Sequence, residues 1–533
     1  QAPANSNASA PGSPASPANP GTLNGDGGDA PIPGGDPKAK YFATDHLKDD
    51  LRGRSVRSGL ITVIASSSSF VISMVSTAVL ARLLSPEDFG LIGMVSVIVG
   101  FIVLFKDMGL SMATVQQEKV THEQVSTLFW INVLISSVIA VLAAVISPAI
   151  AWFYDEPRLL WIGLISAPGQ IISGLIIQHQ ALLRRQMRFG TLSAINITSQ
   201  VGSIAVAITL AWQGWGYWAL VAQALSLGLI NMSLVWIVTG WVPGKMVRGS
   251  GVRPMLKFGG FLTGFNLTNH FARNLDNILI GKFAGSLELG LYQKAYTLLM
   301  LPINQINTPI TSVAIPALSR LQKDPEAYRR YYQRAIGLLV IVGMPVIAFA
   351  AAAAKPIILI LLGEKWLDAV AIFLALSPAA FIGTFNVATG WVYTSMGTSH
   401  RLFRYGIVGA FITCLGFAIG VNWGPIGVAW SLSINFILVR YFAVAYCFAG
   451  TPLKPRHLGV VLWRPALAAV TTGITTWYVW DRWMGQWNLF AAFFAMAGLF
   501  AITYLLCWLI LPGGRQHLID TVKLLKEIKS KRK

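Results

Sequence analysis

The sequence predicts an all-α polytopic membrane protein of about fourteen transmembrane helices: two parallel six-helix lobes around a central cavity, followed by two C-terminal helices. Composition is the first observation. Of 533 residues, 54% are hydrophobic and 12% are charged, about half the charged share of soluble domains. The second is the recurrence of apolar stretches of roughly 18–24 residues, each long enough to cross a hydrocarbon core about 30 Å thick. Their centres lie near residues 68, 100, 138, 168, 202, 228, 269, 302, 345, 378, 412, 437, 471 and 500.

The two ends of the chain differ from the region between them. Residues 1–50 are rich in Pro, Gly, Ala and Ser and lack apolar periodicity, so we expect a disordered tail. They also lack the apolar segment of a secretory signal peptide. Residues 513–533 are predicted to form a basic, amphipathic cytoplasmic tail on the membrane surface, although a solvated tail explains the pattern equally well. Its apolar residues share one helical face: Leu518, Val522, Leu525 and Ile528.

Basic residues gather in alternate loops and predict the orientation. The net charge is +19, which in a soluble protein would suggest nucleic acid as a partner; here its concentration in loops indicates a membrane protein without one. The intervening connections, such as SPEDFG at 85–90 and NWGP at 422–425, are nearly neutral. Because cytoplasmic loops carry the excess of Lys and Arg, both termini are predicted to be cytoplasmic. Tryptophans on the opposite side suit an interfacial belt: Trp152, Trp212, Trp215, Trp366, Trp423, Trp483 and Trp487.

The second half of the chain repeats the first. Landmarks recur in the same order at offsets of 200 to 210 residues: Arg82 and Lys282, Asp88-Phe89-Gly90-Leu91 and Glu288-Leu289-Gly290-Leu291, Pro148 and Pro356, Pro168 and Pro378, Trp215-Gly216 and Trp423-Gly424. Each half holds six predicted spans, an even number, so the halves are parallel repeats. We expect lobes at 51–240 and 241–450 with a cleft between them, and a final pair of spans at 451–512.

One predicted span carries a polar face. The stretch NHFARNLDNILIGKF, residues 269–283, places a His, an Arg, an Asp and three Asn where an apolar helix is expected. An ionisable group inside the membrane costs about 2.5–3.5 kcal/mol, so such a face points away from lipid. The polar residues recur at intervals of three and four and therefore share one side of a helix: Asn266, Asn269, Arg273, Asp276 and Asn277.

This face is predicted to line the cavity between the lobes. Arg273 is the candidate for binding an anionic group of the substrate, with Asn266, Asn269 and Asn277 as polar neighbours. Asp276 is a candidate for carrying a coupling ion. The alternative is an internal pair of Arg273 and Asp276 at i,i+3, which needs no ligand.

Two more cations fall within predicted spans of the second lobe. Lys294 and Arg440 are further cavity candidates, although either side chain can instead extend to the membrane interface. Motifs of catalysis or nucleotide binding are missing from the sequence, so no enzymatic activity and no cofactor are expected. The three cysteines lie in apolar spans without metal-ligand spacing, and no metal site is predicted.

Four segments carry a family resemblance: ARLLSPEDFG at 81–90, DNILIG at 276–281, GLY at 290–292 and PALSR at 316–320. Over about residues 55–511 the chain resembles polysaccharide exporters of the multidrug/oligosaccharidyl-lipid/polysaccharide (MOP) flippase superfamily, above all Wzx-type flippases of the colanic acid kind. The resemblance implies a flippase of the bacterial inner membrane. It would move undecaprenyl-diphosphate-linked oligosaccharide by alternating access, for exopolysaccharide, capsule or O-antigen synthesis.

The same resemblance implies partners and a cationic cavity for the diphosphate. The partners are the lipid-linked oligosaccharide, membrane lipids, and the polysaccharide polymerase with its chain-length machinery. Arg273 fits the cationic role best, followed by Lys294 and Arg440, and the first lobe has no obvious counterpart.

Three rival functions fit the sequence less well. A multidrug cation antiporter of the same superfamily would favour acids over a mid-span arginine. A membrane glycosyltransferase or O-antigen polymerase usually has large outer loops, which this chain lacks. A facilitator-type sugar transporter would carry a different motif after the second span, where GLSMATVQQEKV stands.

Overall fold

The computed structural model describes residues 51–103, 111, 114–115, 117, 120–247 and 253–515. Side chains are described from residue 61 onward within these ranges, apart from those of 102, 253–272 and 399. The tail predicted at 1–50, and most of the one predicted at 513–533, lie outside the described residues. Everything described is helix, turn or loop with no strand, which confirms the all-α prediction.

The helices follow the order that the repeat predicts. The first half contains α1 (Leu51–Leu83), α2 (Pro86–Val103), α4 (His122–Tyr154), α5 (Arg158–Ser166), α6 (Pro168–Arg185), α7 (Phe189–Trp212) and α8 (Trp218–Thr239). The second contains α9 (Arg253–Arg320), α10 (Pro325–Ala352), α11 (Ala354–Leu361), α12 (Ala369–Ser395), α13 (Ser399–Gly420) and α14 (Gly424–Phe448). The chain then continues with α15 (Pro455–Val479), one π-helical turn (Trp480–Met484) and α16 (Leu489–Ile510).

The helices form a multi-pass membrane bundle. Ten stretches of the described residues are long and apolar enough to cross a membrane, and one of them, His400–Phe448, contains both α13 and α14. The 68-residue α9 is not among the ten, although at 1.5 Å per residue it is far longer than one crossing. The predicted total of fourteen spans and the lobe boundaries therefore stay predictions.

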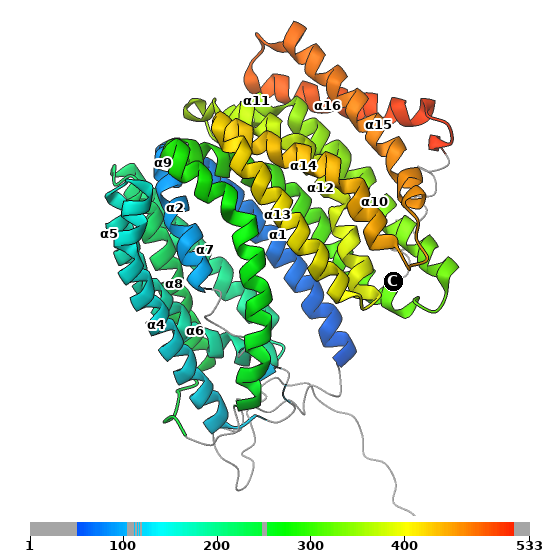
Figure 1. The fold of residues 1–533 in the computed structure, drawn as a ribbon. Coiled ribbons are helices and arrows are strands. Elements are labelled where there is room, and N and C mark those ends of the chain that lie inside the picture. Colours follow the sequence, from blue (N-terminus) through cyan, green and yellow to red (C-terminus); the bar gives the residue numbers. More distant parts are fainter. Residues whose placement is uncertain are drawn as a thin grey trace, which may run out of the picture.

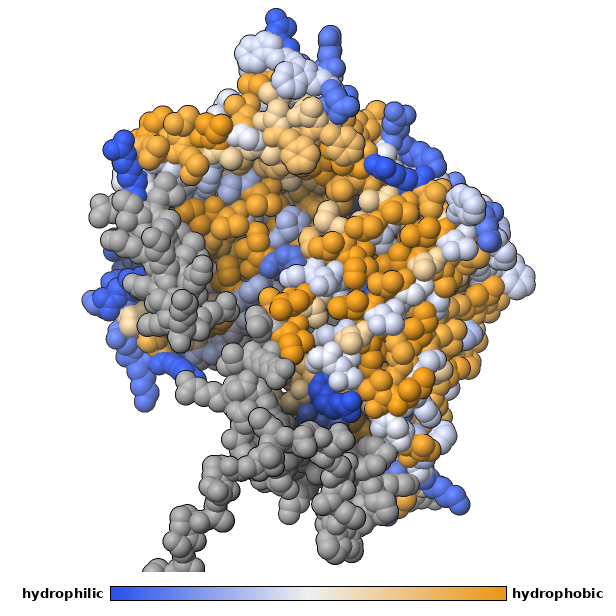
Figure 2. Space-filling view, turned by 180° about the vertical axis from the view of Figure 1, so that it is seen from behind, coloured by the Kyte–Doolittle hydropathy of each residue, from blue (hydrophilic) through white to orange (hydrophobic). Residues whose placement is uncertain are grey.

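The helices gather in two groups. Figure 1 shows α4–α8 on one side and α10–α14 on the other, with α15 and α16 outermost beyond the second group. The two groups meet where α2 packs along α9. In the space-filling view of Figure 2, apolar side chains cover most of the surface, while hydrophilic ones gather at the ends and within a hollow near the middle. An apolar belt between polar ends is the surface expected of a protein embedded in lipid.

Helix α9 is a hairpin. Gly285 has φ 90° and ψ 179°. This conformation is not helical and is favoured by glycine, and it divides α9 into two arms. Hydrogen bonds link the arms: Tyr292 Oη donates to Asp276 Oδ2 at 2.9 Å, and Gln293 Nε2 to Asn277 Oδ1 at 3.1 Å. The two arms are therefore antiparallel neighbours close to the bend.

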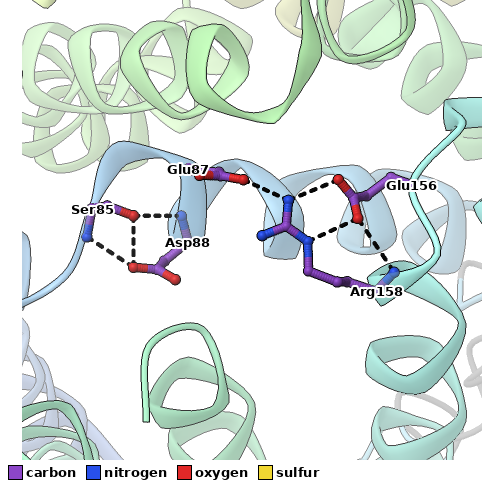
Figure 3. Close-up of polar contacts among 5 residues, drawn as sticks. All are labelled: Ser85, Glu87, Asp88, Glu156 and Arg158. Atoms are coloured by element: carbon purple, nitrogen blue, oxygen red, sulfur yellow. Dashed lines mark hydrogen bonds and ion pairs between the residues drawn. The ribbon is translucent and has the colours of Figure 1, made fainter. Parts of the chain in front are cut away.

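The SPEDFG segment starts α2 and binds it to the beginning of α5 (Figure 3). Ser85 Oγ accepts from the Asp88 N–H at 3.3 Å and donates to Asp88 Oδ2 at 2.8 Å, and the Ser85 N–H also donates to Asp88 Oδ2. This reciprocal cap satisfies donors at the helix start, with Pro86 in the first helical position. Arg158 of α5 forms ion pairs with Glu87 and Glu156. Its hydrogen bonds to Glu156 lower the pKa of that carboxyl.

Backbone conformation supports the duplication independently of sequence. Left-handed residues occur in four pairs that keep the offsets of 208 to 210 residues: Asp155 and Gly363, Met187 and Gly397, Gly216 and Gly424, Gly240 and Gly450. Such residues end helices and redirect the chain. The two halves therefore change direction at corresponding places, even where the residue type differs.

The two halves touch through backbone at a local two-fold crossing, which we call the glycine crossing (Pro86, Gly90, Ser286 and Gly290). A Cβ on Gly90 would lie 1.7 Å from the Ser286 carbonyl oxygen, and one on Gly290 would lie 1.8 Å from the Pro86 carbonyl oxygen. Gly90 and Gly290 are repeat counterparts, and so are Pro86 and Ser286. The contact is reciprocal, and small residues let the two helices approach this closely.

Polar contacts between the halves surround the glycine crossing. Lys282 Nζ donates to Asp155 Oδ2 at 2.6 Å, and its repeat counterpart Arg82 donates from Nη2 to the Ile360 carbonyl at 2.6 Å. Trp366 Nε1 donates to the Ala81 carbonyl at 2.8 Å. The prediction that Trp366 belongs to an interfacial belt is wrong, because the side chain is 0% exposed and packs between the two halves. Trp152, Trp212 and Trp423 are exposed, as a belt requires.

Gly290→Ala is expected to destabilise the protein by about 1–3 kcal/mol, the usual cost of overpacking, because the new methyl group would overlap the Pro86 carbonyl. Thermal unfolding of the purified protein in detergent measures this. Gly498→Ala in α16 is the matched control, since a Cβ there would meet no atom within 4 Å. A Gly290→Ala protein as stable as Gly498→Ala would contradict the glycine crossing.

Candidate functional site

A polar cavity of about 930 Å³ lies among helices of the second half. Its walls come from both arms of α9 and from α12, α13 and α14. Amide and hydroxyl side chains supply much of its polar surface: Asn304, Asn307, Thr311, Asn386, Thr413 and Asn435. In the sequence these residues are single polar positions within apolar spans. That pattern could have indicated the cavity, but they were not predicted as site residues.

Arg273 lines this cavity, but the described lining residues all belong to the second half, so the predicted place of its polar face in a cavity between the lobes stays a prediction. The side chain is exposed, and among the described side chains no ion pair or hydrogen bond with it is found. The alternative pair with Asp276 is not formed, because that carboxylate takes other partners. No described side chain therefore neutralises this guanidinium, and its planar fork suits phosphate.

Arg440 reaches the same cavity from α14. It is 9% exposed, with Nη1 donating to Asn386 Oδ1 and Nη2 to Thr389 Oγ1 at 3.4 Å. Its Nε has no hydrogen-bond partner among the described residues. Both partners are neutral, so the positive charge of this buried guanidinium is not compensated by an acid.

Asp276 is held inside the cavity wall. The side chain is 5% exposed, and besides the bond from Tyr292 it accepts from the Asn277 N–H at 2.8 Å and from Asn277 Nδ2 at 3.1 Å. Asn277 in turn accepts from Gln293. Asn277 therefore orients Asp276 and joins the arms of α9, a role that spacing alone did not indicate. The pairing with Tyr292 and Gln293 depends on the bend at Gly285.

The remaining candidates lie elsewhere. Lys294 is absent from the cavity lining; its Nζ lies 3.8 Å from the ring centroid of Phe89, in the other half. Asn266 and Asn269 belong to α9, but their side chains lie outside the described residues. Among the described residues no group of His, Cys, Asp or Glu could hold a metal ion.

The first half does not repeat this charge. The counterparts of Arg273 and Asp276 at an offset of 200 residues are Ser73 and Ser76, and the counterpart of Arg440 at 210 is Ile230. Ser73 Oγ accepts a hydrogen bond from Gln200 Nε2 at 2.7 Å, which links α1 to α7. The duplicated backbone thus carries helix-to-helix contacts in one half and a cationic cavity in the other.

Comparison with known proteins agrees with this architecture. Residues 79–371 match the family described as polysaccharide biosynthesis protein. The chain is 30% identical over 393 residues to the teichuronic acid biosynthesis protein TuaB of Bacillus subtilis, a match covering 71% of this chain and 80% of TuaB. The chain belongs to this polysaccharide biosynthesis family.

Other members of the family match over most of their length. The lipopolysaccharide biosynthesis protein WzxC of Escherichia coli is 21% identical, and the match covers 80% of this chain and 88% of WzxC. The succinoglycan biosynthesis transport protein ExoT of Rhizobium meliloti is 24% identical over 79% of this chain and 85% of its own.

Solved structures of transporters share the fold. The lipid II flippase MurJ in an inward closed conformation superposes with a TM-score of 0.68, at 15% identity, covering 84% of this chain and 97% of MurJ. An inward-facing multidrug resistance MATE transporter of the MOP superfamily gives 0.56 at 14% identity, covering 72% and 95%. The chain therefore shares the fold of these transporters, while the family match and the relatives confirm the resemblance to polysaccharide exporters seen in the sequence.

Asn386→Leu is expected to lower the free energy of unfolding by about 2–3 kcal/mol, because it removes the acceptor of a buried charged donor. Asn435→Leu is the matched control on the same cavity wall. It removes only the neutral bond from Asn435 Nδ2 to Thr413 Oγ1 at 2.7 Å, so about 1 kcal/mol is expected. Thermal unfolding ranks the two.

The double variant Asn386→Leu/Arg440→Leu completes this comparison. It should recover part of the loss, because it removes the stranded charge together with its partner. Equal effects of the two single variants would show that the Arg440 charge does not depend on Asn386.

Proposed function

We propose that this protein is a flippase that moves a diphosphate-linked, polyprenyl-anchored oligosaccharide across the bacterial inner membrane by alternating access. The observation that carries the proposal is the pair Arg273 and Arg440, two cations that line one cavity and form no ion pair with an acid among the described side chains. The family and the transporter fold support it. They also support a role in transport without enzymatic catalysis. The charge of the loops supports the further proposal that both termini are cytoplasmic.

The chemistry of the cargo explains the cavity. A diphosphate cannot enter hydrocarbon alone, because burying an isolated charge is very costly. Two guanidinium groups lower that cost through charge-assisted hydrogen bonds, which are stronger than neutral ones. The surrounding amides and hydroxyls offer donors and acceptors to sugar hydroxyls, while the polyprenyl chain stays in lipid.

A cation antiporter is the alternative that the fold also permits. Arg273 and Arg440 in the cavity disfavour a cationic drug, since like charges repel at short range. Deleting the gene distinguishes the two: an exporter strain accumulates lipid-linked repeat units on the cytoplasmic side, whereas an antiporter strain becomes sensitive to cationic drugs.

Arg273→Ala is expected to reduce glycan export about 10- to 100-fold, the equivalent of losing one hydrogen-bonded charge worth about 1.5–3 kcal/mol. Lipid-linked precursor, extracted and quantified by mass spectrometry at matched protein levels, should accumulate. Arg320→Ala is the matched control, because Arg320 is exposed at the far end of α9 and outside the cavity lining. Unchanged export in Arg273→Ala would remove this residue from the substrate path.

Asp276 is proposed as the coupling site. It is a carboxylate on the cavity wall, one helical turn from Arg273, and its acceptor bonds leave it able to exchange a proton or a cation with the cavity. Asp276→Asn should export at a rate that no longer responds to the proton gradient. Tyr292→Phe, which removes a hydrogen bond and keeps the carboxylate, should retain the response. A gradient-dependent Asp276→Asn protein would exclude this role.

A further inference from the structure

Lys294 is a positive charge at the contact between the two halves. It follows the Gly285 bend by nine residues on the second arm of α9, and its ammonium lies over Phe89 of α2. The Phe89 ring also packs edge-on against Trp366, with centroids 5.5 Å apart. Among the described residues no carboxylate pairs with Lys294. The ring is therefore the partner of this charge, through a cation–π contact that joins the halves.

The local two-fold symmetry shows that this charge is not required for packing. The repeat counterparts of Phe89 and Lys294 are Leu289 and Met94. Both are buried, and both approach Gly281: a Cβ there would lie 3.3 Å from Met94 Cγ and 3.4 Å from Leu289 Cδ2. An apolar pair thus closes one side of the glycine crossing. A lysine and an aromatic ring close the other.

Lys294 also lies on the same side of its arm as two residues that line the cavity. Thr308 and Ser312 line the cavity and follow Lys294 by 14 and 18 residues on the same arm. At 3.6 residues per turn these intervals are close to four and five whole turns, so the three residues share one side of the helix. Exposed Thr297 lies near this side as well. Polar residues therefore recur along this side between the cavity and the crossing, interrupted by Leu301, and Lys294 is the one next to the crossing.

We propose that the contact of Lys294 with Phe89 is a latch that the anionic head group of the substrate releases. The inference rests on the proposed function. An anion that advances along this side of the arm offers the ammonium charge-assisted hydrogen bonds, which are stronger than its contact with a ring. Lys294 then leaves Phe89, one of the contacts between the halves is lost, and the glycine crossing can open. Opening would thereby depend on the cargo, because the ligand favours the state that frees Lys294.

The test measures access to the crossing with and without substrate. Met94→Cys, made in a protein whose three native cysteines are replaced, puts a thiol at a position that is 2% exposed between the halves. A membrane-impermeant maleimide is added to intact spheroplasts. Cells that make the lipid-linked glycan are compared with cells lacking the first glycosyltransferase of its synthesis. Labelling should rise roughly tenfold with substrate, as the population shifts toward the open state.

Lys294→Met, which copies the counterpart residue, should abolish the difference between the two kinds of cell. Phe89→Leu, which copies the counterpart Leu289, should also abolish the difference. Agreement between the two variants would show that the effect is not a folding defect of one of them. Lys365→Met is the matched control: Lys365 also joins the halves, donating to the Arg82 carbonyl at 3.3 Å, but it lies at an exposed site and bonds only to backbone. It should keep the response.

The possible results distinguish a failure of the latch from a failure of the proposed flippase function. If Arg273→Ala blocks export and precursor accumulates, yet Lys294→Met keeps its substrate-dependent labelling, the latch is wrong and the flippase stands. If labelling never responds to substrate in the parent protein, the latch is likewise wrong. If deletion of the gene causes no precursor to accumulate, the proposed function fails first.

Discussion

The reciprocal contact of Gly90 with Ser286 and of Gly290 with Pro86 is the constraint on which the rest of the structure depends. Each contact requires a glycine on one of the two backbones, because a Cβ on Gly90 or Gly290 would overlap the carbonyl oxygen opposite. The contact sets α2 against the second arm of α9, and that placement puts Phe89 beside Lys294. It also brings Lys282 to Asp155 and Arg82 to Ile360, so the polar contacts around the crossing follow from the packing of two glycines.

Duplication then explains how one backbone serves two purposes. The halves turn at matching left-handed positions, such as Asp155 and Gly363. Their interiors have nonetheless diverged, with serines and Ile230 where the second half has Arg273, Asp276 and Arg440. In the proposed function the second half would therefore bind the head group, and the first half would supply the surface against which it closes. A symmetric clamp would need a cation from each half, and the described residues of the first half line no part of the cavity.

Much of the fold was predictable because it depends on patterns within short segments of the sequence. Apolar length gives the membrane bundle, and the spacing of Asp88-Phe89-Gly90-Leu91 with Glu288-Leu289-Gly290-Leu291 gives the repeat. Helical periodicity placed Arg273 and Asp276 in the cavity wall.

What failed depended on contacts between distant segments. Trp366 has the composition of a belt residue, but its burial is decided by α1 and α2. Asn386 looks like an isolated polar residue until Arg440 of another helix is placed beside it. Lys294 was assigned to the cavity by its charge, whereas its direction is decided by the bend at Gly285.

The cavity residue that says most about the cargo is Asn386, the hydrogen-bond partner of Arg440. A carboxylate at the position of Asn386 would bind the guanidinium more strongly, since charge-assisted bonds exceed neutral ones. It would also cancel the charge and leave little attraction for an incoming anion. Asparagine orients the same guanidinium and leaves its charge intact, at some cost in stability, because a buried charge without a counter-ion is unfavourable. That cost is reduced when an anion arrives, so the cavity gains most when its cargo is a diphosphate and least when its cargo is neutral. The same reasoning applies to Lys294, whose aromatic partner holds the ammonium without neutralising it.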